Sequence, residues 1–248
     1  MSSTNFDYCA DSYGSIMETP WVKHADLYSL LSMMGDLSGK TILDLGCGEG
    51  YFARSMKEKG AAGILGVDMS EELVNIALTH EKQAPLGVRY LCDDITKLHL
   101  EDQLFDTVVS TYVLSLAPNR DILYKMAMAA YSHLKKGGAF YISDDNMDLS
   151  PSCYPLTSKY GFEKKIDGTE LVEGTPVYYH IKTLTETIDV EATYIPLQIW
   201  ETILREVGFQ SVKRHPPIIS PEGIDLFGKA YWDDYVKSPL SIYIEAIK

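Results

Sequence analysis

Short apolar runs alternate with helical patterns from residue 20 to about residue 145. The strand-like runs are KTILDLG, GILGVDM, VRYLCD, FDTVVSTYVL and AFYISDD. Strands connected in this way pair in parallel and carry helices on both faces of the sheet. The alternation predicts an α/β fold with a doubly wound, mostly parallel sheet. Ligands of such sheets bind at the carboxyl ends of the strands.

The pattern changes after residue 146. Residues 147–195 contain prolines, glycines and many Tyr and Thr, and the runs PVYYHIKT and ETIDVEATYI look like antiparallel strands. A helix, PLQIWETILREVGF, and two last strands, SVKRH and SIYIEAIK, are expected to follow. We interpret 147–195 as an insertion that caps the strand ends on the substrate side. Residues 1–248 are then a single domain.

The charge and the cysteines restrict the partners. The net charge of −13 argues against nucleic acid or an anionic membrane, because both require a basic face. No run is long enough to span a membrane, and the first residues lack the pattern of a signal peptide. The four cysteines have no metal-ligand spacing and read as reduced thiols. These features predict a cytoplasmic protein without a metal site.

The stretch ILDLGCGEG, residues 42–50, is a strand followed by a glycine-rich loop. Its spacing is G-x-G-x-G, whereas dinucleotide folds use G-x-G-x-x-G. Asp44 and Glu49 flank the loop, and two carboxylates would repel a pyrophosphate. They would tolerate a ligand without phosphate that carries an ammonium and a sulfonium. S-adenosylmethionine is such a ligand, and the glycines let the backbone approach it closely.

Acidic residues also follow the next two strands. Asp68 ends GVDMS, about twenty residues past the loop, where a carboxylate accepts hydrogen bonds from ribose hydroxyls. Asp94, in LCDDI, is placed to accept from the adenine amine, with the Ile95 amide facing a ring nitrogen. Met69 and Ile95 would sandwich the purine. Asp commonly starts turns, but three acids at successive strand ends favour a ligand site.

With these motifs in place, the sequence resembles the class I S-adenosylmethionine-dependent methyltransferases. ILDLGCGEG, GVDMS, LCDDI, FDTVVSTYVL and LKKGGAFYIS match the motifs of that superfamily in order, over residues 40–143. Flanking segments, among them YGSIMETPWVKH, KYGFEK, EGTPVYY and HPPIISPEG, are similar to small-molecule methyltransferases of the toxoflavin N-methyltransferase group. The resemblance implies a seven-stranded, Rossmann-like sheet with an antiparallel last strand.

The same resemblance implies roles for particular residues. Asp44, Gly46 and Gly48 would hold the methionine end of the cofactor, and Ser110 and Thr111 would lie beside its amino acid portion. Asp68 would bind the ribose, and Asp94 with Ile95 the adenine. Residues 1–24 would form an N-terminal lid, from which Tyr13 closes over the cofactor. The product would be S-adenosylhomocysteine, and the acceptor a planar nitrogen heterocycle.

Methyl transfer requires a nucleophile placed in line with the methyl group and water excluded from the site. A base is needed only when the acceptor must lose a proton. The catalytic candidates lie at the ends of the fourth and fifth strands: Tyr112, Asp144, Asp145 and Asn146. The alternatives are a half-buried Tyr at a strand end and ordinary turn chemistry in ISDDN.

Aromatic residues of the lid and the cap are candidates for stacking on a flat acceptor. We select Tyr8, Trp21, Tyr179 and His180 as substrate residues. The chain has 17 Tyr, so packing is the competing interpretation for each of them. His180 is a candidate base, since histidine titrates near neutral pH.

The leading hypothesis is a methyltransferase that acts on a small molecule, at a nitrogen of a heterocycle or amine. The alternatives are an O- or C-methyltransferase of a small metabolite and a noncatalytic S-adenosylmethionine-binding protein. A nicotinamide-dependent dehydrogenase is disfavoured by the loop spacing and Glu49. The acceptor is the expected partner, and the chain is expected to be a monomer or a homodimer.

Overall fold

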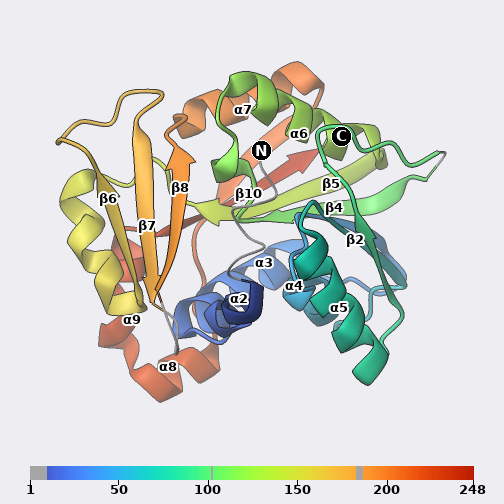
Figure 1. Ribbon diagram of the computed structural model, residues 1–248, viewed down its shortest axis with the longest axis horizontal. Helices are drawn as coiled ribbons and strands as arrows, with labels where there is room; N and C mark the ends of the chain where they lie inside the picture. The colour runs from blue at the N-terminus through green and yellow to red at the C-terminus, as the bar shows by residue number, and fades with distance from the viewer. Residues whose placement is uncertain (1–9, 102, 183–186) are drawn as a thin grey trace.

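The computed structural model of the protein describes residues 10–101, 103–182 and 187–248. Its centre is a seven-stranded sheet with the strand order β3-β2-β1-β4-β5-β10-β9 (Figure 1). The strands are β1 (Thr41–Leu45), β2 (Gly63–Asp68), β3 (Val88–Cys92), β4 (Phe105–Thr111), β5 (Leu134–Asp145), β9 (Ser211–His215) and β10 (Ser241–Ile247). Only β10 runs against the others, antiparallel to both β5 and β9. The predicted α/β fold, with its antiparallel last strand, is confirmed.

Helices cover both faces of this sheet (Figure 1). One face carries α3 (Leu27–Met34), α4 (Tyr51–Glu58) and α5 (Glu71–Gln83), and the other carries α6 (Arg120–Ser132) and α7 (Leu197–Val207). Ser70 caps α5, because its hydroxyl accepts a hydrogen bond from the Leu73 amide. The first described elements are α2 (Ala10–Met17) and a π-helix, η1 (Val22–Asp26), which runs directly into α3.

A second sheet follows β5. It has the order β6-β7-β8 and is antiparallel throughout, with β6 (Phe162–Ile166), β7 (Pro176–Lys182) and β8 (Thr187–Thr193). Strand alternation along β7 buries Val177 and Tyr179 and leaves Tyr178 and His180 more exposed. A 3₁₀ helix, η3 (Pro151–Tyr160), connects β5 to this sheet and packs against β6. The predicted antiparallel strands of this region are therefore present.

Capping and strand pairing set two of the element boundaries. The helix α6 begins at Arg120, because the Asn119 side chain caps it. The KKGG segment belongs to β5, because Leu134 already pairs with Phe105. The short helices η2 (Leu114–Leu116), α8 (Pro221–Phe227) and α9 (Lys229–Lys237) have little apolar periodicity and were not predicted.

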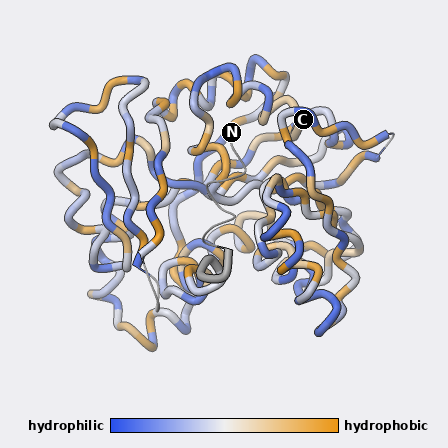
Figure 2. Tube along the Cα trace, viewed as in Figure 1, coloured by the Kyte–Doolittle hydropathy of each residue, from blue (hydrophilic) through white to orange (hydrophobic). Residues whose placement is uncertain are grey.

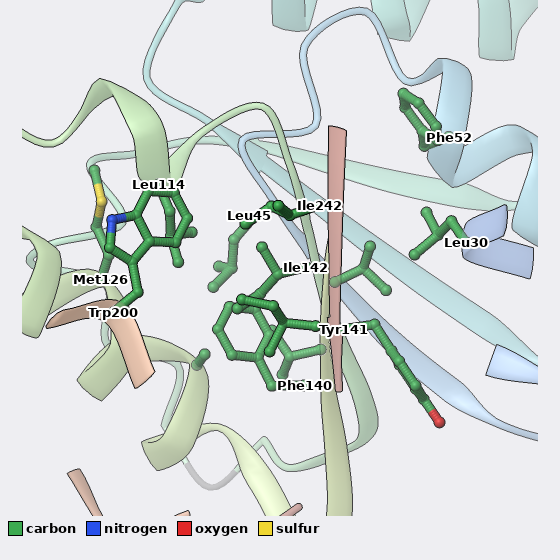
Figure 3. Packing of buried hydrophobic residues seen from close by; sticks show 14 of the residues in the cluster. Leu30, Leu45, Phe52, Leu114, Met126, Phe140, Tyr141, Ile142, Trp200 and Ile242 are labelled. Carbon is green, nitrogen blue, oxygen red and sulfur yellow. The ribbon is translucent and has the colours of Figure 1, made fainter. Parts of the chain in front are cut away.

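Apolar side chains pack against both faces of the sheet. Leu30 and Phe52 lie on one side of the central strands, and Met126 and Trp200 lie on the other, as the close view shows (Figure 3). Hydrophilic residues lie outside this core, for example at the end of α5 (Figure 2). In the described part of the chain, no helix has the length and apolarity needed to cross a membrane.

Candidate active site

The chain turns sharply at Gly46, the first residue of the glycine loop after β1. Gly46 has φ = 75°, and a Cβ there would lie 2.1 Å from Cγ2 of Val113. The amides of Gly46 and Cys47 both donate to the Val67 carbonyl, at 2.7 and 3.1 Å. The left-handed conformation and the close approach both require glycine at position 46.

Asp68 and Asp94 occupy the ends of β2 and β3 as predicted. One oxygen of Asp68 accepts from the Gly48 amide at 2.8 Å and the other from the Ser70 amide at 2.9 Å, which ties the glycine loop to β2. Asp94 accepts from the amide and hydroxyl of Thr96. Partial burial opposes ionisation of Asp94, but these bonds and Lys97 outweigh it and hold its pKa below the ordinary value.

A cleft opens at these strand ends. Its lining includes most of the predicted cofactor residues: Gly46, Gly48, Asp68, Met69, Asp94, Ile95 and Thr111. Ser110 is not part of this lining, because strand alternation turns its buried side chain away from that of Thr111. Tyr13 belongs to α2, but its side chain lies outside the described residues.

Asp44 lies fully buried at the end of β1, beside this loop. Both of its carboxylate oxygens lack a hydrogen-bond partner among the described residues. Burial, and secondly the charge of Asp68, raise the pKa of Asp44 to about 7. A buried carboxylate without partners is costly unless a cation or donor approaches it. The ammonium of S-adenosylmethionine is such a group, so the residues present fit the cofactor.

The helix α2 lies against the glycine loop. A Cβ at Gly14 would lie 2.8 Å from Oε2 of Glu49, so this helix contacts the loop directly. Glu49 is nearly buried there, and burial raises its pKa. Cys47 is buried as well, and burial raises the pKa of its thiol, which makes it a neutral space-filling residue.

Tyr112, the first residue after β4, stands between two cavities. Its φ of 58° is the only positive value among the described non-glycine residues. Such strain is uncommon and concentrates at functional positions. Tyr112 lines both the cofactor cleft and a second cavity. Its hydroxyl donates to Asp26 and lies 3.2 Å from the hydroxyl of Ser241.

The second cavity is mainly apolar and is built from distant segments. The N-terminal segment contributes Met17 and Trp21, and the small sheet contributes Phe162, Tyr179 and Ile188. The Trp21 ring lies 5.1 Å from the Phe162 ring and meets the Tyr112 ring edge-on at 5.7 Å. The Trp21 indole N–H is buried without a hydrogen-bond partner in the described part of the chain.

Asp145 is the one charged residue of this second lining. Its Oδ2 accepts from Lys164 Nζ at 2.5 Å and from the Tyr179 hydroxyl at 2.9 Å. The Lys164 side chain is 0% exposed, and its ammonium also donates to the Asn146 carbonyl. The buried ion pair joins β5 to β6, and it leaves no net charge at this wall.

The other predicted residues of this group lie elsewhere. Asp144 is buried and accepts from the amides of Val113, Leu114 and Ser115, so it holds η2 and does not face the second cavity. The Asn146 amide donates to the Pro239 carbonyl. His180 is on the outer face of β7 and pairs with Asp189 at 2.6 Å. The structure does not bring these three side chains to the cavity, and Tyr8 lies outside the described residues.

Sequence reasoning missed several residues of this region. Asp26 comes from a segment without a recognisable motif, and Tyr235 and Tyr243 lie near the end of the chain. Phe162 and Lys164 lie in KYGFEK, but the resemblance of that segment assigns them no role. A buried Asp within the helical run KHADLYSLL is the one signal that points to Asp26, because a carboxylate inside a protein needs donors.

Comparisons with known proteins bear on this geometry. Residues 42–138 match the family model described as a methyltransferase domain. An O-methyltransferase of ubiquinone biosynthesis from Coxiella burnetii is 33% identical over 134 residues, which cover 54% of this chain and 56% of that protein. The chain thus spans about half the length of the curated relatives it matches.

Solved structures share the fold along nearly the whole chain. The CcbJ methyltransferase of Streptomyces caelestis superposes with a TM-score of 0.67 at 17% identity, covering 100% of this chain and 98% of that one. The phosphoethanolamine N-methyltransferase 2 of Haemonchus contortus, solved with S-adenosylmethionine, has a TM-score of 0.61 at 20% identity and covers 100% and 60%.

Residues 42–138 form a methyltransferase domain, and the predicted class I S-adenosylmethionine-dependent superfamily and its cofactor are confirmed for this part of the chain. The methyltransferase core extends from β1 into β5, and the segments before and after it supply most of the second cavity.

Proposed function

We propose that this chain transfers the methyl group of S-adenosylmethionine to a nitrogen of a small, neutral heterocycle. The observation that carries the proposal is that Tyr112 lines both the cofactor cleft and the apolar cavity. A molecule in the second cavity would meet a cofactor in the first at this residue. Residues 147–195 then act as a cap over the acceptor, and residues 1–24 as a lid.

The chain's residues would hold the cofactor as follows. Asp44 takes the ammonium, Asp68 the ribose hydroxyls, and Asp94 with Ile95 the adenine. The bound cofactor supplies an electrophilic methyl group. Positioning of the acceptor and exclusion of water are then the main tasks of the protein.

The second cavity supports a flat and uncharged acceptor. Trp21, Phe162 and Tyr179 offer aromatic surface to a ring. The carboxylate of Asp145 is already neutralised by Lys164, so it offers little attraction to a cationic amine. The unpartnered N–H of Trp21 favours an acceptor that carries a carbonyl or ring nitrogen.

An oxygen acceptor is the second candidate, and the similarity to an O-methyltransferase of ubiquinone biosynthesis supports it. The same apolar cavity suits a phenol. A noncatalytic cofactor-binding protein is the third. The net charge of −13 supports an enzyme for small molecules over one for nucleic acids.

The test is transfer of a labelled methyl group from S-adenosylmethionine to panels of N–H heterocycles, phenols and primary amines. We expect incorporation with the heterocycles and not with the amines. Incorporation with phenols alone would replace nitrogen by oxygen as the acceptor atom. No incorporation with any panel, despite tight binding of S-adenosylhomocysteine, would favour the noncatalytic alternative.

A further inference from the structure

A buried carboxylate lies behind Tyr112 and has no part in the proposed cofactor site. Asp26, the last residue of η1, is 0% exposed. Its Oδ1 accepts from the hydroxyls of Tyr235 at 2.6 Å and Tyr243 at 2.5 Å, and its Oδ2 accepts from Tyr112. Three donors on one side chain are the arrangement of an ionised carboxylate.

These bonds fix the direction of the Tyr112 hydroxyl. Because its proton is directed to Asp26, the oxygen presents a lone pair to its other neighbours. Tyr112 and Ser241 both line the apolar cavity, and their hydroxyls lie 3.2 Å apart. A donor group of a molecule bound beside this pair would meet the Tyr112 oxygen.

We propose that Asp26, acting through Tyr112, makes the acceptor cavity select a neutral molecule that presents an N–H or O–H group to the Tyr112 oxygen. The inference rests on the proposed function, and it names the part of the acceptor that is recognised. Asp26 is a positioning residue, since it touches Tyr112 and not the acceptor. The same arrangement rejects anions, because an oxyanion would face a lone pair and a carboxylate behind it.

The arrangement also provides a destination for the proton that leaves the acceptor. As the nitrogen or oxygen forms its bond to the methyl carbon, the bond pair of the breaking carbon–sulfur bond remains on sulfur. The acceptor proton passes to the Tyr112 oxygen, and the Tyr112 proton passes to Oδ2 of Asp26. A positive sulfonium and a negative carboxylate are thereby both neutralised.

The surroundings of Asp26 suit this role. In the described part of the chain, the titratable groups that face it from β4, α9 and β10 are Tyr112, Tyr235 and Tyr243, all of them neutral phenols. Its neighbour in η1, His24, bonds instead to Ser220. Burial raises the pKa of Asp26, although the tyrosine hydrogen bonds oppose this, and the shift makes the carboxylate a better proton acceptor.

The Asp26→Asn variant provides a test, because the two tyrosine donors at Oδ1 will hold the amide oxygen there. The amide NH₂ then faces Tyr112 and donates to its oxygen, and the Tyr112 proton turns toward the cavity. Selectivity should invert: the wild type prefers a neutral donor, and the variant prefers an anion. A purely structural Asp26 would weaken both forms equally.

The probe is 4-nitrophenol, whose phenol and phenolate differ in colour, added to protein saturated with S-adenosylhomocysteine. We expect the wild type to bind the phenol at least about tenfold more tightly than the phenolate. A difference of this size is what one hydrogen bond to the Tyr112 oxygen, itself bonded to the Asp26 carboxylate, can provide. Asp26→Asn should reverse this preference, and Tyr112→Phe, which leaves the Asp26 carboxylate in place, should abolish it. Tyr194→Phe removes a hydroxyl from another tyrosine–aspartate pair and is the matched control.

Equal binding of the two forms by the wild type would overturn the inference, and so would an unchanged preference in Tyr112→Phe. Failure of the wild type to bind either form would also overturn it. Failure of the proposed function is a separate result, because it would appear as absent binding of S-adenosylhomocysteine before any probe is added.

Discussion

The cofactor cleft and the acceptor cavity meet at Tyr112, but they are built in different ways. The cleft is made by consecutive βα turns, and its key contacts are backbone hydrogen bonds, such as those of the glycine loop to Val67 and Asp68. The cavity is made by side chains from the N-terminal segment, the small sheet and β10. The cleft can therefore keep one ligand while the cavity changes with its side chains.

The largest effect is expected on the acceptor side, from Lys164→Met. The change leaves Asp145 buried without its ammonium partner, which costs about 3–5 kcal/mol of folding free energy when a buried pair is broken. Denaturant unfolding measures the loss. Lys165→Met, at an exposed neighbour, is the control and should stay within about 0.5 kcal/mol of the wild type. A small loss in Lys164→Met would contradict a buried, charged pair.

On the cofactor side, the largest effect is expected from Gly46→Ala, which changes the backbone of the glycine loop. The added Cβ meets Val113 and the residue must keep a positive φ, so we expect about 2–4 kcal/mol of destabilisation together with loss of S-adenosylhomocysteine binding. Gly39→Ala has the same φ of 75° and open space around it. It should lose only about 1–2 kcal/mol and keep the binding. Equal behaviour of the two variants would show that the contact with Val113 is unimportant.

A smaller effect, on S-adenosylhomocysteine affinity, distinguishes the cofactor cleft from the acceptor cavity directly. Asp68→Ala should weaken S-adenosylhomocysteine binding by about tenfold or more, because a paired ribose contact is lost. Tyr179→Phe, on the acceptor side, should leave that affinity unchanged. Calorimetry measures both variants. An unaltered affinity in Asp68→Ala would remove the ribose assignment.

The pH dependence of cofactor binding tests Asp44. Its pKa of about 7 in the folded protein is raised by burial, so the carboxylate that attracts the ammonium is lost as the pH falls through 7. Affinity for S-adenosylhomocysteine should fall by up to about tenfold per pH unit below that value. In the free protein the sign is opposite: the raised pKa lowers folding stability as the pH rises from about 4 to 7. Asp44→Asn should remove both dependences.

The smallest effect is expected at His180. It lies on the outer face of β7 and its partner Asp189 is 69% exposed, so His180→Ala should change folding free energy by less than about 0.5 kcal/mol and leave methyl transfer unaltered. Loss of methyl transfer in this variant would mean that the outer face of the small sheet belongs to the site.

The same difference explains what could be predicted from the sequence. The position of Asp68, Asp94 and the glycines at one edge of the sheet could be predicted, because parallel strands bring their ends together. Asp144 and Asp145 are adjacent in sequence, but strand alternation sends one to the η2 amides and the other to Lys164. Asp26 and Tyr243 are 217 residues apart, and no local sequence pattern predicts their contact.

The most direct test of the central claim is calorimetric titration of the protein with S-adenosylhomocysteine, run beside NADH. The cleft at the β1, β2 and β3 ends predicts micromolar or tighter binding of S-adenosylhomocysteine and no binding of NADH. Binding of NADH, or of neither ligand, would contradict the assignment of Asp44, Asp68 and Asp94 to a methyl-donor site.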